Sequence, residues 1–370
     1  MKFSCEKYLL QQACSVASRA TASKSTIPAL EGLLLEADLS LRVTGYDLRK
    51  GIYTRVEADV AERGSIVVGA RFLGEMLRRL PDGIVSLSAD ENMNVTVKCG
   101  RSEFNFIGIN PADFPEMPHV DGVNNITVPQ NILRSMINQT IFAVATNDAR
   151  PIYTGTLFEI SEDMLTLVSV DGYRLAKRTE KIEKGHMEDC SFVVPGSALS
   201  DIERICSDEE GEVSIAVGSK HILFTIGDTV VVSRRLEGEF LNYRKSIPES
   251  FRFTVKVEKS EFMSSIDRVA LIISEKNSSP VRLTFEDDHI RCLCTTPIGK
   301  AEDICSCEGS GDRLEIGFND RYLMDALKAA AADKLQLCLN SASSPCIVRA
   351  EDGGDSFTYM ILPVRLRAGD

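Results

Sequence analysis

Two strand-like stretches, Thr156-Leu157-Phe158-Glu159-Ile160 and Leu165-Thr166-Leu167-Val168-Ser169-Val170-Asp171-Gly172-Tyr173, decide the fold because the chain contains the same pair three times. The first copy has its strands at 31–35 and 41–47, and the third has them at 281–285 and 290–295. Such short, largely apolar stretches are typical of β-strands in a half-buried sheet. A unit of about 120 residues that recurs three times predicts a chain built from three similar domains.

Each copy also contains two helix patterns. An apolar strand opens the copy and precedes residues such as Leu133, Met136 and Ile137, whose spacing is that of a helix lying on a sheet. A second helix is predicted at 71–80, 199–206 and 322–331. Two helices and several antiparallel strands per copy predict an α+β fold of three repeated domains, each with two helices packed on antiparallel sheet. We place the domains at 1–120, 125–246 and 248–370.

The composition limits the location and the partners of the chain. No apolar stretch approaches the roughly 20 residues of a membrane-spanning helix, and no signal-peptide core follows Met1. We therefore expect a cytoplasmic protein with no membrane contact. The net charge of −12 argues against ordinary tight binding to phosphate backbones, unless the basic residues gather on one surface.

The cysteines allow two interpretations. Eleven cysteines in a chain without a signal peptide favour reduced thiols over disulfides. Cys292 with Cys294, and Cys305 with Cys307, could in principle offer four thiolates to zinc. Structural zinc sites usually have two or more residues between paired ligands, so we favour small apolar side chains in a core and expect no metal.

Motifs for catalysis are missing. His119, His186, His221 and His289 have no spacing that would place two of them on one helix face as metal ligands, and there is no phosphate-binding loop or dinucleotide fingerprint. The stretch 308–311 is interpreted as a flexible turn and the acidic stretch 208–212 as a solvated loop. We therefore predict no enzyme, no catalytic residue and no cofactor.

Basic residues recur on the predicted helices and in the loops after them. They could be solvated helix faces, or they could form one surface that contacts phosphates without reading bases. The recurrence over several helices favours the second interpretation. The candidate DNA-binding residues are Arg19, Lys24, Arg71, Arg78, Arg79, Arg134, Arg150, Arg204 and Arg268.

Several motifs, in this order along the chain, resemble those of one protein family. They are Ser25-Thr26-Ile27-Pro28-Ala29-Leu30-Glu31-Gly32, Thr44-Gly45-Tyr46-Asp47-Leu48, Pro111-Ala112-Asp113-Phe114-Pro115, Asp171-Gly172-Tyr173-Arg174-Leu175-Ala176 and Leu362-Pro363-Val364-Arg365-Leu366. They are similar to those of bacterial DNA polymerase III beta subunits, the sliding clamps of DNA replication. The resemblance implies a head-to-tail homodimer whose six domains form a ring. This ring would encircle duplex DNA without sequence preference and act as a processivity factor.

The resemblance also implies two protein contacts. One is a cleft that receives short peptides from the DNA polymerase III alpha subunit, the clamp-loader delta subunit, other polymerases and repair proteins. Its residues would be Tyr153, Val170, Gly172, Tyr173, Arg174, Leu175, Leu241, Ile247, Cys346, Met360, Leu362, Pro363, Val364 and Arg365. The other contact is the dimer interface, with Phe104 and Phe106 from the first domain and Ile272 and Ile273 from the third.

Two other classes of protein compete with a clamp. A repeat-built scaffold for protein interactions would never touch DNA, and the basic residues on helix faces argue against it. A zinc-dependent thiol enzyme would require a metal, and a stoichiometric zinc content would favour it.

Overall fold

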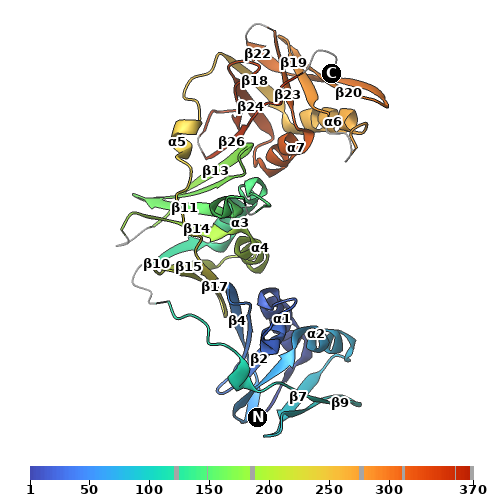
Figure 1. The fold of residues 1–370 in the computed structure, drawn as a ribbon, viewed down its shortest axis with the longest axis vertical. Helices are drawn as coiled ribbons and strands as arrows, with labels where there is room; N and C mark the ends of the chain where they lie inside the picture. Colours follow the sequence, from blue (N-terminus) through green and yellow to red (C-terminus); the bar gives the residue numbers. More distant parts are fainter. Residues whose placement is uncertain are drawn as a thin grey trace. The chain divides into compact units, whose positions relative to one another are not determined.

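The computed structural model describes residues 1–120, 125–147, 149–183, 188–274, 279–310, 313–354 and 356–366 (Figure 1). The chain forms two compact units. The first comprises Met1–Arg134, Gly185–Met187 and Ser197–Arg235, and the second comprises Ser135–Lys184, Glu188–Gly196 and Leu236–Asp370. Within the described ranges, no helix has the length and apolar character needed to cross a membrane.

The first unit contains two antiparallel sheets. A five-stranded sheet has the order β5 (Asp59–Glu62), β1 (Lys2–Glu6), β7 (Ile84–Ala89), β8 (Asn94–Cys99), β9 (Ser102–Ile107). An eight-stranded sheet has the order β10 (Asn125–Pro129), β15 (Glu212–Val217), β16 (His221–Ile226), β17 (Thr229–Arg234), β4 (Lys50–Val56), β3 (Leu41–Tyr46), β2 (Gly32–Ala37), β6 (Gly64–Gly69).

Helices α1 (Lys7–Ala17) and α2 (Ala70–Arg79) pack side by side in the first unit (Figure 1). Their apolar residues recur with helical spacing, so that one face of each helix is buried in a core shared with both sheets. Leu10 of α1 and Leu73 of α2 are fully buried there. Most of α4 (Gly196–Ile205) also belongs to this unit, and short turns η1 (Ser18–Ala20), η2 (Pro28–Glu31) and η3 (Pro111–Asp113) connect the longer elements.

The second unit also contains two antiparallel sheets. A nine-stranded sheet has the order β14 (Cys190–Pro195), β11 (Gly155–Ser161), β12 (Met164–Val170), β13 (Arg174–Lys181), β26 (Phe357–Ile361), β25 (Cys346–Ala350), β24 (Lys334–Leu339), β18 (Phe253–Glu258), β22 (Glu308–Ser310). A four-stranded sheet has the order β21 (Gly299–Ser306), β20 (His289–Thr296), β19 (Val281–Phe285), β23 (Leu314–Phe318). The remaining elements are α3 (Gln130–Asn138), which spans the unit boundary, η4 (Ile141–Ala143), η5 (Pro151–Thr154), α5 (Tyr243–Ser246), α6 (Lys259–Ala270) and α7 (Asp320–Ala329).

The predicted α+β fold with three repeated domains is confirmed. Module 1 runs from β1 through α1, β2–β4, β6 and α2 to β7–β9. Module 2 repeats this order from β10 through α3, β11–β14 and α4 to β15–β17, and module 3 repeats it from β18 through α6, β19–β21, β23 and α7 to β24–β26. In every module one helix follows the first strand, and a second helix precedes the last three strands.

The sheets continue from one module into the next. Strand β4 of module 1 pairs with β17, the last strand of module 2, and Lys50 lies opposite Ser233. In the same way β13 of module 2 pairs with β26, the last strand of module 3, and Arg174 lies opposite Ile361. The two compact units cut through module 2 because these pairings join its strands to both of its neighbours.

A few predicted details are wrong. The stretch 308–311, interpreted as a flexible turn, contributes Glu308–Ser310 to β22, because these residues find pairing partners on β18. Ile141 and Ile273 continue the apolar spacing of α3 and α6, but both helices end before them: Ile141 lies in the separate η4, and Ile273 follows α6. His186 lies outside the described residues.

The cysteine pairs lie mainly in the core, as predicted. Cys292, Cys294 and Cys305 are buried in the hydrophobic core of the second unit, and Cys307 packs against it. Burial raises the pKa of the Cys294 and Cys307 thiols, to about 11 for Cys307, so both stay protonated near neutral pH. Among the described residues, no three His, Cys, Asp or Glu side chains gather as a metal site would require.

Candidate functional site

A cluster of apolar side chains in the second unit brings together much of the predicted cleft. Val170, Leu175 and Met360 are buried members of this cluster, and the partly buried Tyr153, Leu241 and Ile247 pack against them. They come from η5, from β12, β13 and β26, and from the segment that follows β17. Residues far apart in the sequence thus meet because β13 and β26 pair across the module boundary.

The β12–β13 turn forms an exposed edge beside this cluster. The Asp171 carboxylate accepts hydrogen bonds from the backbone N–H groups of Tyr173 and Arg174, at 2.9 and 3.0 Å. Gly172 has a φ of +94°, a conformation that L-residues rarely adopt, so glycine suits this turn. The Tyr173 side chain is 60% exposed.

The C-terminal segment continues this edge. The backbone N–H of Leu362 donates to the carbonyl oxygen of Tyr173 at 2.9 Å, and that of Val364 donates to Gly317 at 2.8 Å. Leu362 and Pro363 are half-buried, whereas Val364 and Arg365 are exposed. The predicted residues of the C-terminal motif therefore lie next to the β12–β13 turn.

Arg174 is held on several sides. Its guanidinium donates to Asp171 at 3.0 Å and to Asp325 of α7 at 2.5 Å. It also lies 4.5 Å from the ring centroid of Tyr322 and 5.4 Å from that of Phe142. Burial, and next the charge of Asp171, raise the pKa of Tyr322, so its phenol is neutral near pH 7. Since only 11% of the Arg174 side chain is exposed, its charge is compensated by these neighbours rather than by solvent.

The cluster differs from the prediction in its membership. Cys346 belongs to the main core of the second unit rather than to the cluster, and burial raises its pKa. Phe240, whose ring meets that of Tyr153 edge to face at 5.6 Å, was not predicted from the sequence. Nor was Tyr243, whose hydroxyl donates to Glu159 at 2.6 Å. The signal for both was the presence of large apolar residues at intervals through the otherwise polar segment 236–251, because a fully solvated linker does not need them.

The predicted DNA-binding residues fall into two groups. Lys24, Arg71, Arg150 and Arg204 are exposed and form no ion pair within the described part of the chain. The others pair with carboxylates, as in Arg19 with Asp201 at 3.8 Å and Arg268 with Asp303 at 2.6 Å. The remaining pairs are Arg78 and Arg79 with Glu75, and Arg134 with Glu203 and Asp208.

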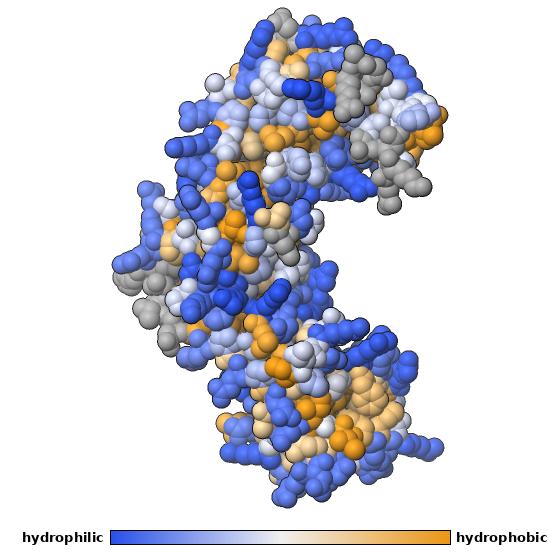
Figure 2. Space-filling model, in the orientation of Figure 1, coloured by the Kyte–Doolittle hydropathy of each residue, from blue (hydrophilic) through white to orange (hydrophobic). Residues whose placement is uncertain are grey.

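The predicted interface residues lie at one sheet edge and after one helix. Phe104 and Phe106 belong to β9, the end strand of the five-stranded sheet, while Ile272 and Ile273 follow α6 and pack partly against its core. Exposed apolar residues surround both places, including Ile107 (78% exposed) near the first and Ile304 (55%) on β21, an end strand of the four-stranded sheet. Figure 2 shows hydrophobic colour over α2 and β9, and again at the end of the β20–β21 hairpin.

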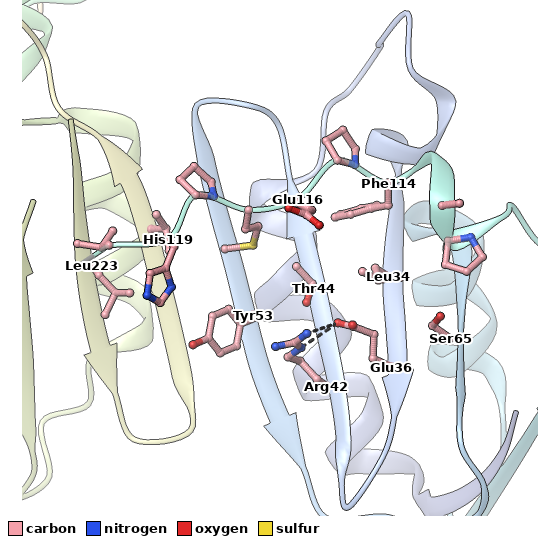
Figure 3. A pocket seen from close by; sticks show the side chains of 17 residues that line it. Leu34, Glu36, Arg42, Thr44, Tyr53, Ser65, Phe114, Glu116, His119 and Leu223 are labelled. Atoms are coloured by element: carbon pink, nitrogen blue, oxygen red, sulfur yellow. Dashed lines mark hydrogen bonds and ion pairs between the residues drawn. The ribbon is translucent and has the colours of Figure 1, made fainter. Parts of the chain in front are cut away.

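At the junction of modules 1 and 2, the segment 111–120 covers the sheet. Residues 111–120 cross β2, β3 and β4 toward β16 and β17, and they border a cavity of about 770 Å³ that also contains the Glu36–Arg42 ion pair (Figure 3). A Cβ atom at Gly51 would lie 2.7 Å from the methyl carbon of Met117. Gly51 follows its turn as Leu175 follows the turn in module 2, and Met117 occupies the space that a side chain at position 51 would need.

Three copies of one module, joined through continuous sheets, define a clamp fold, the scaffold of non-catalytic processivity factors. Comparison with known proteins agrees. Family models for the DNA polymerase III beta subunit match in series: the N-terminal domain at residues 1–118, the central domain at 127–242 and the C-terminal domain at 244–365.

Individual relatives support the same family. A beta sliding clamp of Staphylococcus aureus is 32% identical over 358 residues, which cover 94% of each chain. The crystal structure of the Bacillus subtilis DNA polymerase sliding clamp matches with a TM-score of 0.96 at 28% identity, covering 99% of this chain and 100% of that one. A Pseudomonas aeruginosa sliding clamp bound to griselimycin matches with a TM-score of 0.94 at 29% identity, again covering 99% and 100%.

The chain therefore belongs to the DNA polymerase III beta subunit family. Its function is that of a sliding clamp, a processivity factor in DNA replication that carries out no catalysis itself.

Proposed function

We propose that two copies of this chain join head to tail in a six-domain ring around duplex DNA. The observation that carries this proposal is the pair of end strands β9 and β21. In modules 1 and 2 the strand after the hairpin turn, β4 or β13, pairs with the last strand of the following module. In module 3 the corresponding strand is β21. Of the last strands of the three modules, β17 and β26 are already paired in this way, which leaves β9 of module 1. Both are sheet ends within the described residues, so a second copy can supply each with its partner.

The apolar residues at these edges support the same arrangement. Phe104 and Phe106 would meet Ile272 and Ile273 of the second copy, and each closed interface would cover side chains that water now reaches. Because the contact joins different surfaces of the two copies, it closes only when the rotation completes a ring.

The DNA contacts follow from the basic helix residues. Within the described residues, the members of the proposed set without an ion pair are Lys24, Arg71, Arg150 and Arg204. Arg19, Arg78, Arg79, Arg134 and Arg268 belong to the set as paired cations. Phosphate contacts carry no sequence register, so the ring would slide on DNA of any sequence. Closure around the duplex, rather than charge, would hold a protein with a net charge of −12 on DNA.

The apolar cluster beside the β12–β13 turn is our proposed binding cleft for peptide segments of other proteins. A pocket of aliphatic and aromatic side chains suits one or two anchoring side chains of an extended peptide. The partners would be the DNA polymerase III alpha subunit, the clamp-loader delta subunit, other polymerases and repair proteins. The proposed lining is Tyr153, Val170, Gly172, Tyr173, Arg174, Leu175, Leu241, Ile247, Met360, Leu362, Pro363, Val364 and Arg365, with Cys346 in the core behind it.

The domain limits and the location complete the proposal. Domains at 1–120, 125–246 and 248–370 are supported by the matched residues of the family models. A cytoplasmic location is supported by the role in replication that the relatives' names describe.

A topological test decides between this ring and a scaffold that never touches DNA. The protein is loaded on a nicked circular plasmid by a clamp loader and ATP, and the mixture is passed over a sizing column. We expect it to elute with the circle and to be released when a restriction enzyme linearises the plasmid. Elution with the plasmid before and after linearisation, or with neither form, would contradict the ring.

A further inference from the structure

Two module junctions contain the same ion pair. In module 1 the turn Asp47–Lys50 leads into β4, and the Lys50 ammonium pairs with Asp201 of α4, 151 residues away. In module 2 the turn Asp171–Arg174 precedes β13, and the Arg174 guanidinium pairs with Asp325 of α7, also 151 residues away. Each aspartate stands five residues after the first residue of its helix, so the two pairs occupy equivalent positions of the repeat.

The turns themselves are built alike. Asp47 accepts the backbone N–H groups of Arg49 and Lys50 at 2.8 and 2.7 Å, as Asp171 accepts those of Tyr173 and Arg174. Each turn thus directs a cation toward the carboxylate of the next module's second helix. The two pairs differ in their surroundings, because only the second one lies beside the proposed cleft.

Arg174 connects Asp325 to residues of that cleft. The ring of Tyr322, on which the guanidinium lies, also stacks on Tyr173 with centroids 5.9 Å apart and planes inclined by 24°. The carbonyl oxygen of Tyr173 in turn accepts the N–H of Leu362. The Asp325 carboxylate therefore helps to fix the turn and, through it, the C-terminal segment. Without this carboxylate, Asp171 would be the remaining anion on the guanidinium.

We propose that Asp325 is a positioning residue of the partner cleft: by holding Arg174 it keeps Tyr173 and Leu362 in place before a peptide arrives. This inference rests on the proposed function of the cleft. A rim that is already ordered loses less conformational freedom on binding, so the contribution of Asp325 is to affinity rather than to a direct peptide contact. The partner is a peptide segment with apolar anchors. Griselimycin serves as the probe because the related Pseudomonas aeruginosa sliding clamp binds it.

The test compares matched variants of the full chain. Asp325→Asn removes the charge at the cleft, and Asp201→Asn makes the same change at the equivalent pair of the other junction. Griselimycin binding is measured by calorimetry for both variants and for the unchanged protein. We expect Asp325→Asn to weaken binding about tenfold, which corresponds to about 1.4 kcal/mol, and Asp201→Asn to change it less than twofold. Asp325→Glu, which keeps the charge, should recover part of the loss.

Hydrogen exchange supplies a second measurement that does not depend on the probe. The amide of Leu362 should exchange faster in Asp325→Asn than in Asp201→Asn, since the turn that carries its acceptor is freed in the first variant alone. Unchanged affinity and exchange in Asp325→Asn would overturn the positioning role. Equal loss of affinity in both variants would also overturn it, because the effect would then be general destabilisation. If the unchanged protein does not bind griselimycin, the proposed cleft fails this test, and the exchange of the Leu362 amide alone decides whether Asp325 positions the rim.

Discussion

The Lys50 ammonium and the Asp201 carboxylate pair although only 11% of each side chain is exposed. Lys50 begins β4 and Asp201 lies in α4, so the pair joins module 1 to module 2 beside the β4–β17 pairing. Arg19 approaches the same carboxylate at 3.8 Å. One buried carboxylate therefore compensates two cations. The Arg19 side chain is 30% exposed and keeps access to water, whereas Lys50, at 11%, depends on the carboxylate.

Removing this carboxylate should destabilise the first unit. We expect Asp201→Ala to lower the free energy of unfolding by about 3 kcal/mol, because it leaves Lys50 buried without a partner. The measurement is a urea titration followed by a probe in the first unit. The double variant Lys50→Met with Asp201→Leu should recover most of the loss, since well-packed apolar residues can replace a buried pair. A single variant as stable as the original protein would contradict this account.

His289 and His221 should titrate on opposite sides of the ordinary histidine value. A hydrogen bond to Asp288 raises the pKa of His289, whereas burial, with Arg234 and Lys220 adding, lowers that of His221. For His289 the folded state holds the proton more tightly. Its stabilising contribution is thus complete below the unfolded pKa near 6.5 and is lost as the pH rises through the folded pKa.

Proton NMR titration of the two imidazoles checks this prediction. Asp288→Asn should bring the His289 pKa back toward its ordinary value and leave that of His221 unchanged. Equal pKa values for the two histidines in the unchanged protein would refute it.

The repeat, and with it the α+β class, could be predicted because it depends on local patterns. Apolar spacing alone identifies a strand such as 165–170 and a helix such as 130–138. Module-spanning sheets could not be predicted in this way, since the pairing of β4 with β17 joins residues about 180 apart and leaves no local signal. The stretch 308–310 illustrates the limit: its glycine and serine favour a turn, yet the free edge of β18 makes it a strand.

The cleft could be predicted only in part. The turn around Asp171 has a motif that can be recognised, but the family resemblance, not the motif, joined it to Leu362. Phe240 was missed because its role depends on how the linker returns to Tyr153. The basic residues could be identified from the sequence, but the ion pairs that they form could not be predicted. The sequence around a helical arginine does not indicate whether a carboxylate such as Asp208 lies nearby in the fold.

The ion pairs predict that the proposed DNA-binding residues are unequal. Arg204 is exposed and forms no ion pair in the described residues, whereas Arg134 pairs with Asp208 at 2.5 Å, which raises its pKa. We expect Arg204→Ala to reduce the slope of log affinity against log salt by about 1 for a short linear duplex. Arg134→Ala should change the slope less, because Asp208 already neutralises part of its charge.

Fluorescence anisotropy at a series of salt concentrations measures these slopes. Arg55→Ala is the control. Arg55 is also exposed, but it lies on β4 opposite Arg42, on the face of the sheet that does not carry α1. An equal reduction for Arg55 and Arg204 would show that total charge, and not a DNA-facing surface, determines the affinity.

Substitutions at the proposed interface should convert the dimer to monomers. Ile272→Ala with Ile273→Ala removes apolar surface from the proposed interface, and sedimentation measures the mass. Both residues also pack against the core, so a fold-neutral variant is needed. Ile304→Lys supplies it, because Ile304 is 55% exposed on β21 and a buried lysine there would oppose closure. We expect a monomer mass for either variant at micromolar concentration.

Leu39→Lys controls for the added charge, since Leu39 is 85% exposed in the β2–β3 turn and lies outside the proposed interface. It should keep the dimer mass. A dimer for Ile304→Lys as well would mean that β21 stays open to solvent in the assembly. The strand pairing inferred from β4–β17 and β13–β26 would then not extend to a second copy, because lysines on an edge strand oppose its pairing with another strand.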